Sequence, residues 1–98
     1  MTAQSHIHQL LEQATAILPV SDEELISKGI AAGVSERILA LKRATVRLQE
    51  KYGSLEELER RIKKEGISPD DHTLYTDLLE WRAIRHEFAE LLRILEAL

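Results

Sequence analysis

The sequence predicts an all-α protein, in which short helices precede a long amphipathic C-terminal helix and oligomerisation completes the helical bundle. Aromatic residues make up 4% of the 98-residue chain, and no long stretch alternates apolar and polar residues as a half-buried strand would. Proline, glycine and serine instead separate segments in which apolar residues recur at helical spacing. We therefore expect a single helical domain over residues 1–98.

The first two elements are predicted to be short helices. Apolar residues recur on one face of residues 4–18, and Pro19 ends that helix because proline disfavours helical geometry in the residue before it. Ser21 and Glu24 have the spacing of a capping box, in which each side chain accepts a hydrogen bond from the backbone N–H group of the other residue. The second helix is predicted to end near Gly33, since glycine readily adopts the left-handed geometry of a C-cap.

A third helix is predicted from a cap at Ser35 to Tyr52, which makes residues 1–52 a possible three-helix unit. Within this unit, residues 30–35 resemble the turn of a helix-turn-helix reader of DNA, because a small-residue helix end precedes a new helix. A small transcriptional regulator built on residues 22–52 is therefore one alternative function. A plain connection between two helices is the simpler interpretation of the same segment.

Residues 54–98 carry the signals of a helical hairpin. A capping box that begins at Ser54 predicts a fourth helix, which ends at Gly66. Ser68, followed directly by proline and two aspartates, predicts the start of the final helix. Nothing in the sequence ends this helix before Leu98, so its expected length is about 45 Å.

An apolar seam runs along the predicted final helix and widens toward its C-terminal end. Its members recur at alternating steps of four and three residues, as in a coiled coil, and Arg85 is the charged member. Such a seam can dock onto a neighbouring helix or into a groove of another protein. The predicted partner-binding residues are Trp81, Ile84, Phe88, Leu91, Leu92 and Leu95.

Other apolar residues lie off the main faces of the predicted helices. They are more than a two-layer monomer of this length can bury, so we expect the chain to form a dimer or larger homo-oligomer. These surplus residues are Leu39, Val46, Leu79 and Ile94.

A basic stripe on the predicted third helix is the best candidate for nucleic-acid contact. Arg43, Arg47 and Lys51 are spaced four residues apart, so their side chains share one helix face and could reach phosphates. The chain as a whole has a net charge of −4, which opposes binding to nucleic acid. We expect any such binding to be weak and strongly dependent on salt.

The sequence contains no recognisable catalytic, metal-binding or cofactor-binding motif. The chain has no cysteine, its four histidines lack the spacing of metal ligands, and it has neither a phosphate-binding loop nor a nucleophile motif. The carboxylate pairs Asp77–Glu80 and Glu87–Glu90 are predicted to be a solvated helix face rather than Mg²⁺ ligands. We therefore expect no enzyme activity, no metal, no cofactor and no small-molecule substrate.

The hydropathy pattern predicts a cytoplasmic protein without a membrane segment. No apolar run approaches the ~18 residues that a membrane-spanning helix needs. The first residues also lack the basic and apolar segments of a secretory signal peptide.

Two segments of the chain together resemble a known family. The segments are LQEKYGSLEEL at residues 48–58 and LLEWRA at residues 78–83. The matching positions in and beside them are Lys51, Tyr52, Gly53, Leu55, Leu58, Ile62, Asp77, Glu80 and Trp81. Residues 48–98 resemble small antitoxin-like proteins of cyanobacterial and archaeal toxin–antitoxin modules.

The resemblance implies a non-catalytic protein that neutralises a toxin, often a predicted ribonuclease, by docking its long helix against it. A homodimeric helical scaffold or adaptor is a further alternative.

Overall fold

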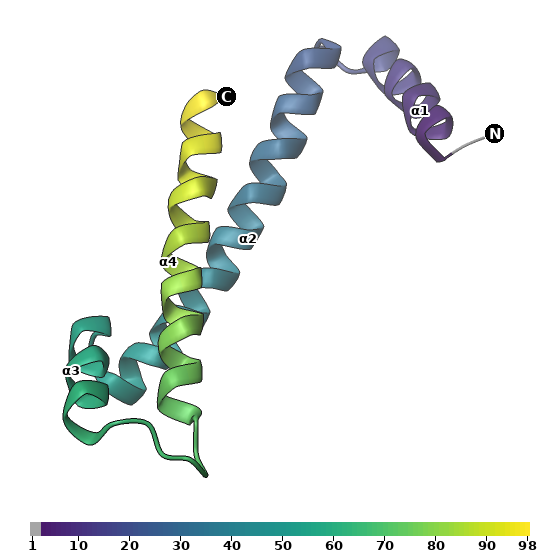
Figure 1. Ribbon diagram of the computed structural model, residues 1–98. Helices are drawn as coiled ribbons and strands as arrows, with labels where there is room; N and C mark the ends of the chain where they lie inside the picture. Colours follow the sequence, from purple (N-terminus) through teal and green to yellow (C-terminus); the bar gives the residue numbers. More distant parts are fainter. Residues whose placement is uncertain (1–2) are drawn as a thin grey trace.

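The computed structural model describes residues 3–98 (Figure 1). The helices are α1 (Ala3–Ile17), α2 (Asp22–Tyr52), α3 (Leu55–Glu65) and α4 (Thr73–Ala97). The described residues contain no strand, which confirms the predicted all-α class with a long helix at its C-terminal end. None of the described helices is both long enough and apolar enough to cross a membrane.

The two longest helices, α2 and α4, form an antiparallel pair. Arg37 of α2 pairs with Glu87 of α4, whereas Lys51 pairs with Asp77, so the residue numbers run in opposite directions. The 31 residues of α2 span about 46 Å and the 25 residues of α4 about 37 Å. Helix α3 packs at one end of this pair, and α1 lies at the opposite end, where it contacts α2 (Figure 1).

The predicted break at Gly33 is wrong, because α2 continues through it without interruption. Residues 30–35 are helical, so the predicted helix-turn-helix turn is absent, and the described residues 3–52 contain two helices rather than three. Gly33 retains helical geometry, whereas Gly53 and Gly66 have the positive φ angles of helix-ending glycines, 90° and 75°. A glycine inside a helix costs only about 1 kcal/mol relative to alanine, which the favourable residues on both sides outweigh.

A glycine-to-alanine substitution is expected to change the free energy of unfolding in opposite directions at these two kinds of glycine. Nothing lies within 4 Å of the position that a Cβ on Gly33 would occupy. We therefore expect Gly33→Ala to raise the free energy of unfolding by about 0.5–1 kcal/mol, because alanine loses less backbone entropy in a helix. At Gly53, where φ is 90°, alanine is expected to lower the free energy of unfolding by about 1–3 kcal/mol, because a residue with a side chain is strained at this φ angle.

Thermal unfolding followed by circular dichroism measures both substitutions. Gly33→Ala should shift the midpoint upward by a few degrees and Gly53→Ala downward. A destabilising effect of Gly33→Ala would show that a helix ends at this residue.

The second correction concerns the start of α4, which is Thr73 rather than the residue after Ser68. Two side chains in this segment accept hydrogen bonds from backbone N–H groups two residues ahead: Ser68 Oγ from Asp70 at 3.3 Å, and Asp71 Oδ1 from Thr73 at 2.9 Å. Such local bonds compete with the hydrogen bonds of a helical turn, so residues 66–72 form a connection. The final helix is accordingly shorter than predicted.

The core lies where α2, α3 and α4 meet, in the half of the molecule that contains α3. Trp81 of α4 is 2% exposed and Leu58 of α3 is fully buried, and these two side chains are at its centre. Leu58 and its neighbour Leu55 hold α3 against the long helices. The contiguous core cluster comprises Leu41, Leu48, Leu55, Leu58, Leu78, Trp81 and Ile84.

Candidate functional site

The six predicted partner-binding residues divide into two groups along α4. Trp81 and Ile84 are 2% and 8% exposed and belong to the core, so they are not accessible to a partner in the folded chain. Phe88 and Leu91 are partly buried and pack against the core from its edge. Leu92 is 40% exposed and Leu95 is half-buried, which places the accessible part of the seam in the last turns of α4.

A similar set of exposed apolar residues lies on α2, toward the same end of the antiparallel pair. Ile26 and Ile30 continue, at steps of three and four residues, the face of α2 that carries Ile38 and Leu41 in the core. They are nevertheless 50% and 42% exposed. We call this region the open end; it consists of Ile26 and Ile30 of α2 together with Leu91, Leu92, Leu95 and Leu98 in and just after α4.

The open end arises because the two long helices diverge. Figure 1 shows α2 and α4 crossing near α3 and separating toward the C-terminal end of α4. The apolar spacing of both helices extends past the point at which their side chains still bury one another. An apolar side chain such as Leu98, 51% exposed, therefore remains in water at this end.

Helix α1 adds a second exposed apolar surface at the same end of the molecule. Its apolar residues share one face by spacing, and Ile7 and Ile17 are 59% and 83% exposed. In the view of Figure 1, α1 extends from the start of α2 on the side away from α4. The α1 face consists of Ile7, Leu10, Ile17 and Leu18.

The surplus apolar residues predicted from the sequence are also exposed, but they are scattered. Leu39 and Val46 are 54% and 49% exposed on α2, and Leu79 and Ile94 are 46% and 43% exposed on α4. None of them belongs to the core, although Val46 borders a hollow of about 410 Å³ that Ile84 and Phe88 also line. Single exposed apolar residues of this kind are common on protein surfaces, whereas the open end gathers six apolar residues at one end of the helix pair.

One member of the basic stripe is paired with a carboxylate. Arg43, Arg47 and Lys51 are all exposed, as predicted. Lys51, however, pairs with Asp77 at 3.1 Å, and a shallow hollow of about 280 Å³ brings Arg47 and Glu80 to the same surface. Carboxylates of α4 therefore border part of the stripe.

A polar cluster of Lys51, Tyr52 and Asp77 joins the C-terminal end of α2 to the first turns of α4. The Tyr52 hydroxyl and the Lys51 ammonium group both donate hydrogen bonds to Oδ2 of Asp77. Burial alone raises the pKa of Asp77, but these two hydrogen bonds and the charge of Lys51 outweigh it and hold that pKa below its ordinary value of 3.8. Burial, together with the bond to Asp77, raises the pKa of Tyr52 above its ordinary value of 10.0.

Removing the Tyr52 hydroxyl should destabilise the fold in a pH-dependent way. We expect Tyr52→Phe to lower the free energy of unfolding by about 1–2 kcal/mol at neutral pH, because a hydrogen bond to a partly buried carboxylate is lost. The pKa of Asp77 is lowered in the folded chain, so the stability that its carboxylate contributes is present above pH 3.8 and is lost as the pH falls below that value. The difference between wild type and variant should therefore shrink on acidification.

Urea unfolding at neutral pH and below pH 3.8 measures this difference. Tyr75→Phe is the control. Tyr75 is 41% exposed, and among the described residues the tyrosine that donates a hydrogen bond to Asp77 is Tyr52. A Tyr52→Phe effect that is the same at both pH values would contradict the assignment to Asp77.

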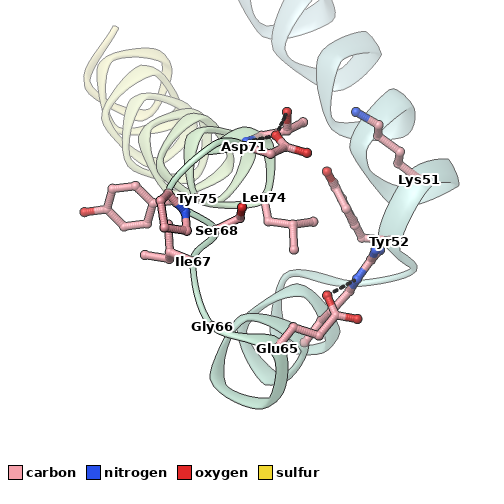
Figure 2. Close-up of a pocket in the computed structure, with 12 residues that line it drawn as sticks. Lys51, Tyr52, Glu65, Gly66, Ile67, Ser68, Asp71, Leu74 and Tyr75 are labelled. Atoms are coloured by element: carbon pink, nitrogen blue, oxygen red, sulfur yellow. Dashed lines mark hydrogen bonds and ion pairs between the residues drawn. The ribbon is translucent and has the colours of Figure 1, made fainter.

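The hollow beside this cluster, about 650 Å³ in volume, is bordered by the connection between α3 and α4 (Figure 2). Lys51 and Tyr52 lie on one side of it, and residues 66–71 on the other. Two cations border it, but each is already paired with a carboxylate, Lys51 with Asp77 and Arg61 with Glu65. Within residues 3–98, no group of three or more histidine, aspartate or glutamate side chains could hold a metal ion.

The comparison with protein families gives a match over the whole chain. A family model covers residues 1–98, and its description is the uncharacterized protein MJ0235 family. The chain belongs to this family. Neither the curated proteins nor the solved structures give a match to it.

Proposed function

We propose that this MJ0235-family protein is a protein-binding module that catalyses no reaction of its own and acts by docking its open end onto another protein. The observation that carries the proposal is the continuation of the apolar faces of α2 and α4 past the core. Ile30 and Leu92, 42% and 40% exposed, mark this continuation on the two helices. Exposed apolar residues that gather at one end of a molecule in this way favour an interaction site.

A protein partner fits this surface better than a nucleic acid does. The open end consists of aliphatic side chains, which gain free energy when a partner removes them from water. Two of the cations that border it are paired with carboxylates, Arg37 with Glu87 at 2.8 Å and Arg93 with Glu90 at 3.0 Å. The net charge of −4 further opposes approach to phosphates.

The concrete form of this proposal is an antitoxin that acts in the cytoplasm. It is supported by the resemblance of residues 48–98 to antitoxin-like proteins, a stretch that includes all of α4. The last turns of α4 would lie in a groove of the toxin and block it, so that neutralisation requires one antitoxin for each toxin.

Growth rescue by co-expression tests this proposal. The protein is expressed together with the product of the neighbouring gene, and wild type should relieve the growth arrest that this product causes. Leu92→Glu should abolish the rescue, because a carboxylate at the centre of the open end loses its water on docking. The control Leu79→Glu changes a residue of similar exposure, 46%, elsewhere on the same helix and should rescue normally.

Rescue by Leu92→Glu as efficient as that by wild type would contradict the proposed docking surface. Circular dichroism of both variants checks that they remain helical, since both replaced side chains are exposed and neither belongs to the core.

A further inference from the structure

We infer that, in the protein without a bound partner, a second copy of the chain covers the open end and forms a two-fold symmetric dimer. This inference rests on the proposed function in one respect, because it uses the same docking surface. It adds the identity of the molecule that occupies this surface when no other protein does.

The size of the exposed surface supports a second copy. A compact monomer of 11.2 kDa has an accessible surface of about 5,700 Å², whereas this chain exposes 7445 Å². The excess is about twice the 800 Å² that each partner buries in a standard interface. The single chain therefore has enough surplus surface for a stable dimer.

The shape of the chain leads to the same conclusion. Its radius of gyration is 20.4 Å, against about 13 Å for a compact domain of this length. The molecule extends over 62 × 29 × 19 Å, and its buried core is confined to the half that contains α3. The other half consists of α1 and the diverging ends of α2 and α4, whose apolar faces lack a core of their own.

The aliphatic residues that define the open end can face a copy of themselves without bringing like charges of their own together. In a two-fold dimer the same patch is present on both subunits, so any unbalanced charge would meet an equal charge. The six residues of the open end are uncharged, and the bordering ion pairs Arg37–Glu87 and Glu90–Arg93 are neutral within one chain. Apposition of two such ends brings four helices together, which is the number in a standard helical bundle.

Helix α1 has its exposed apolar face at the same end of the molecule, so the dimer also gives this face a neighbour. Ile17, at 83% exposure, has almost its entire side chain in water. Each α1 would lie along the second copy and extend the new core beyond the four central helices.

Sedimentation equilibrium of the full chain at micromolar concentrations tests the dimer. Wild type should have twice the 11.2 kDa mass of the chain. Ile30→Glu should raise the dimer dissociation constant by about 100-fold or more, because the two-fold axis places each substitution in the interface twice. Leu39→Glu is the matched control on the same helix, since Leu39 is 54% exposed and lies outside the open end.

Dimeric wild type and Leu39→Glu together with monomeric Ile30→Glu would support the inference. A monomeric wild type, a dimeric Ile30→Glu or a monomeric Leu39→Glu would each overturn it. A monomeric wild type would leave the proposed function intact, because the growth assay measures a complex with a different protein. Failure of rescue with a dimeric wild type would instead contradict the proposed function alone.

Discussion

Replacing Trp81 with alanine is expected to lower the free energy of unfolding by about 3–5 kcal/mol. The indole is 2% exposed and lies in the only buried cluster of the described residues, between residues contributed by α2 and α3. Small domains have total stabilities of about 5–15 kcal/mol, so this loss removes a large share of the free energy of unfolding. Alanine at this position also leaves a cavity that the neighbouring helices cannot fill.

Urea unfolding followed by circular dichroism measures this loss. Leu79→Ala is the control on the same helix, because Leu79 is 46% exposed and its truncation should change stability by less than about 0.5 kcal/mol. Equal stabilities of the Trp81→Ala and Leu79→Ala variants would contradict the placement of Trp81 in the core.

Truncation of Leu58 is expected to have the second largest effect, a loss of about 2–5 kcal/mol. This side chain is fully buried, and with Leu55 it provides the apolar contact that holds α3 against the long helices. The ion pairs from Arg82 to Glu59 and from Arg85 to Glu56 also connect α3 to α4, but both are largely exposed. Surface pairs contribute little, so they cannot replace the lost burial.

Loss of Leu58 should also release α3, which limited proteolysis detects. We expect Leu58→Ala to increase cleavage within residues 55–72 at a protease concentration that leaves wild type intact. Ile67→Ala serves as the control, because Ile67 is 49% exposed in the adjoining connection. Wild-type resistance in Leu58→Ala would show that the exposed ion pairs are sufficient to hold α3.

The helix boundaries that the sequence predicted correctly depend on local contacts. The hydroxyl groups of Ser21 and Ser54 accept hydrogen bonds at 3.1 Å from the N–H groups three residues ahead, as the capping-box spacing predicted. Gly53 and Gly66 end helices with positive φ angles. In each case the interacting groups lie within a few residues, so a short window of sequence contains the whole signal.

The incorrect boundaries arise where two local signals compete. Gly33 resembles a helix-ending glycine, but strong helix formers on both sides continue the helix through it. Ser68 resembles a helix cap, but its hydroxyl bonds to Asp70 and stabilises a turn instead. Helix propensity alone does not determine which of two local arrangements forms, because packing of the neighbouring segments also contributes to the free energy of each arrangement.

The candidate site depended on the register of α2 against α4, which the sequence does not specify. The seam on α4 was evident, but its spacing does not distinguish Trp81 and Ile84 in the core from Leu92 outside it. That division is made by the divergence of α2. The contact of Tyr52 with Asp77, 25 residues apart in sequence, was likewise unpredictable before the two helices were aligned.

Amide hydrogen exchange of the free chain at low and high protein concentration tests the central claim, that the open end is a docking surface, most directly. We expect residues 22–34 and 91–98 to exchange more slowly at high concentration, because the second copy covers them there. Exchange around Trp81, in the core at both concentrations, should not change. Unchanged exchange at 22–34 and 91–98, with slowing confined to residues around Leu39 and Val46, would contradict the claim and place the binding surface on the middle of α2.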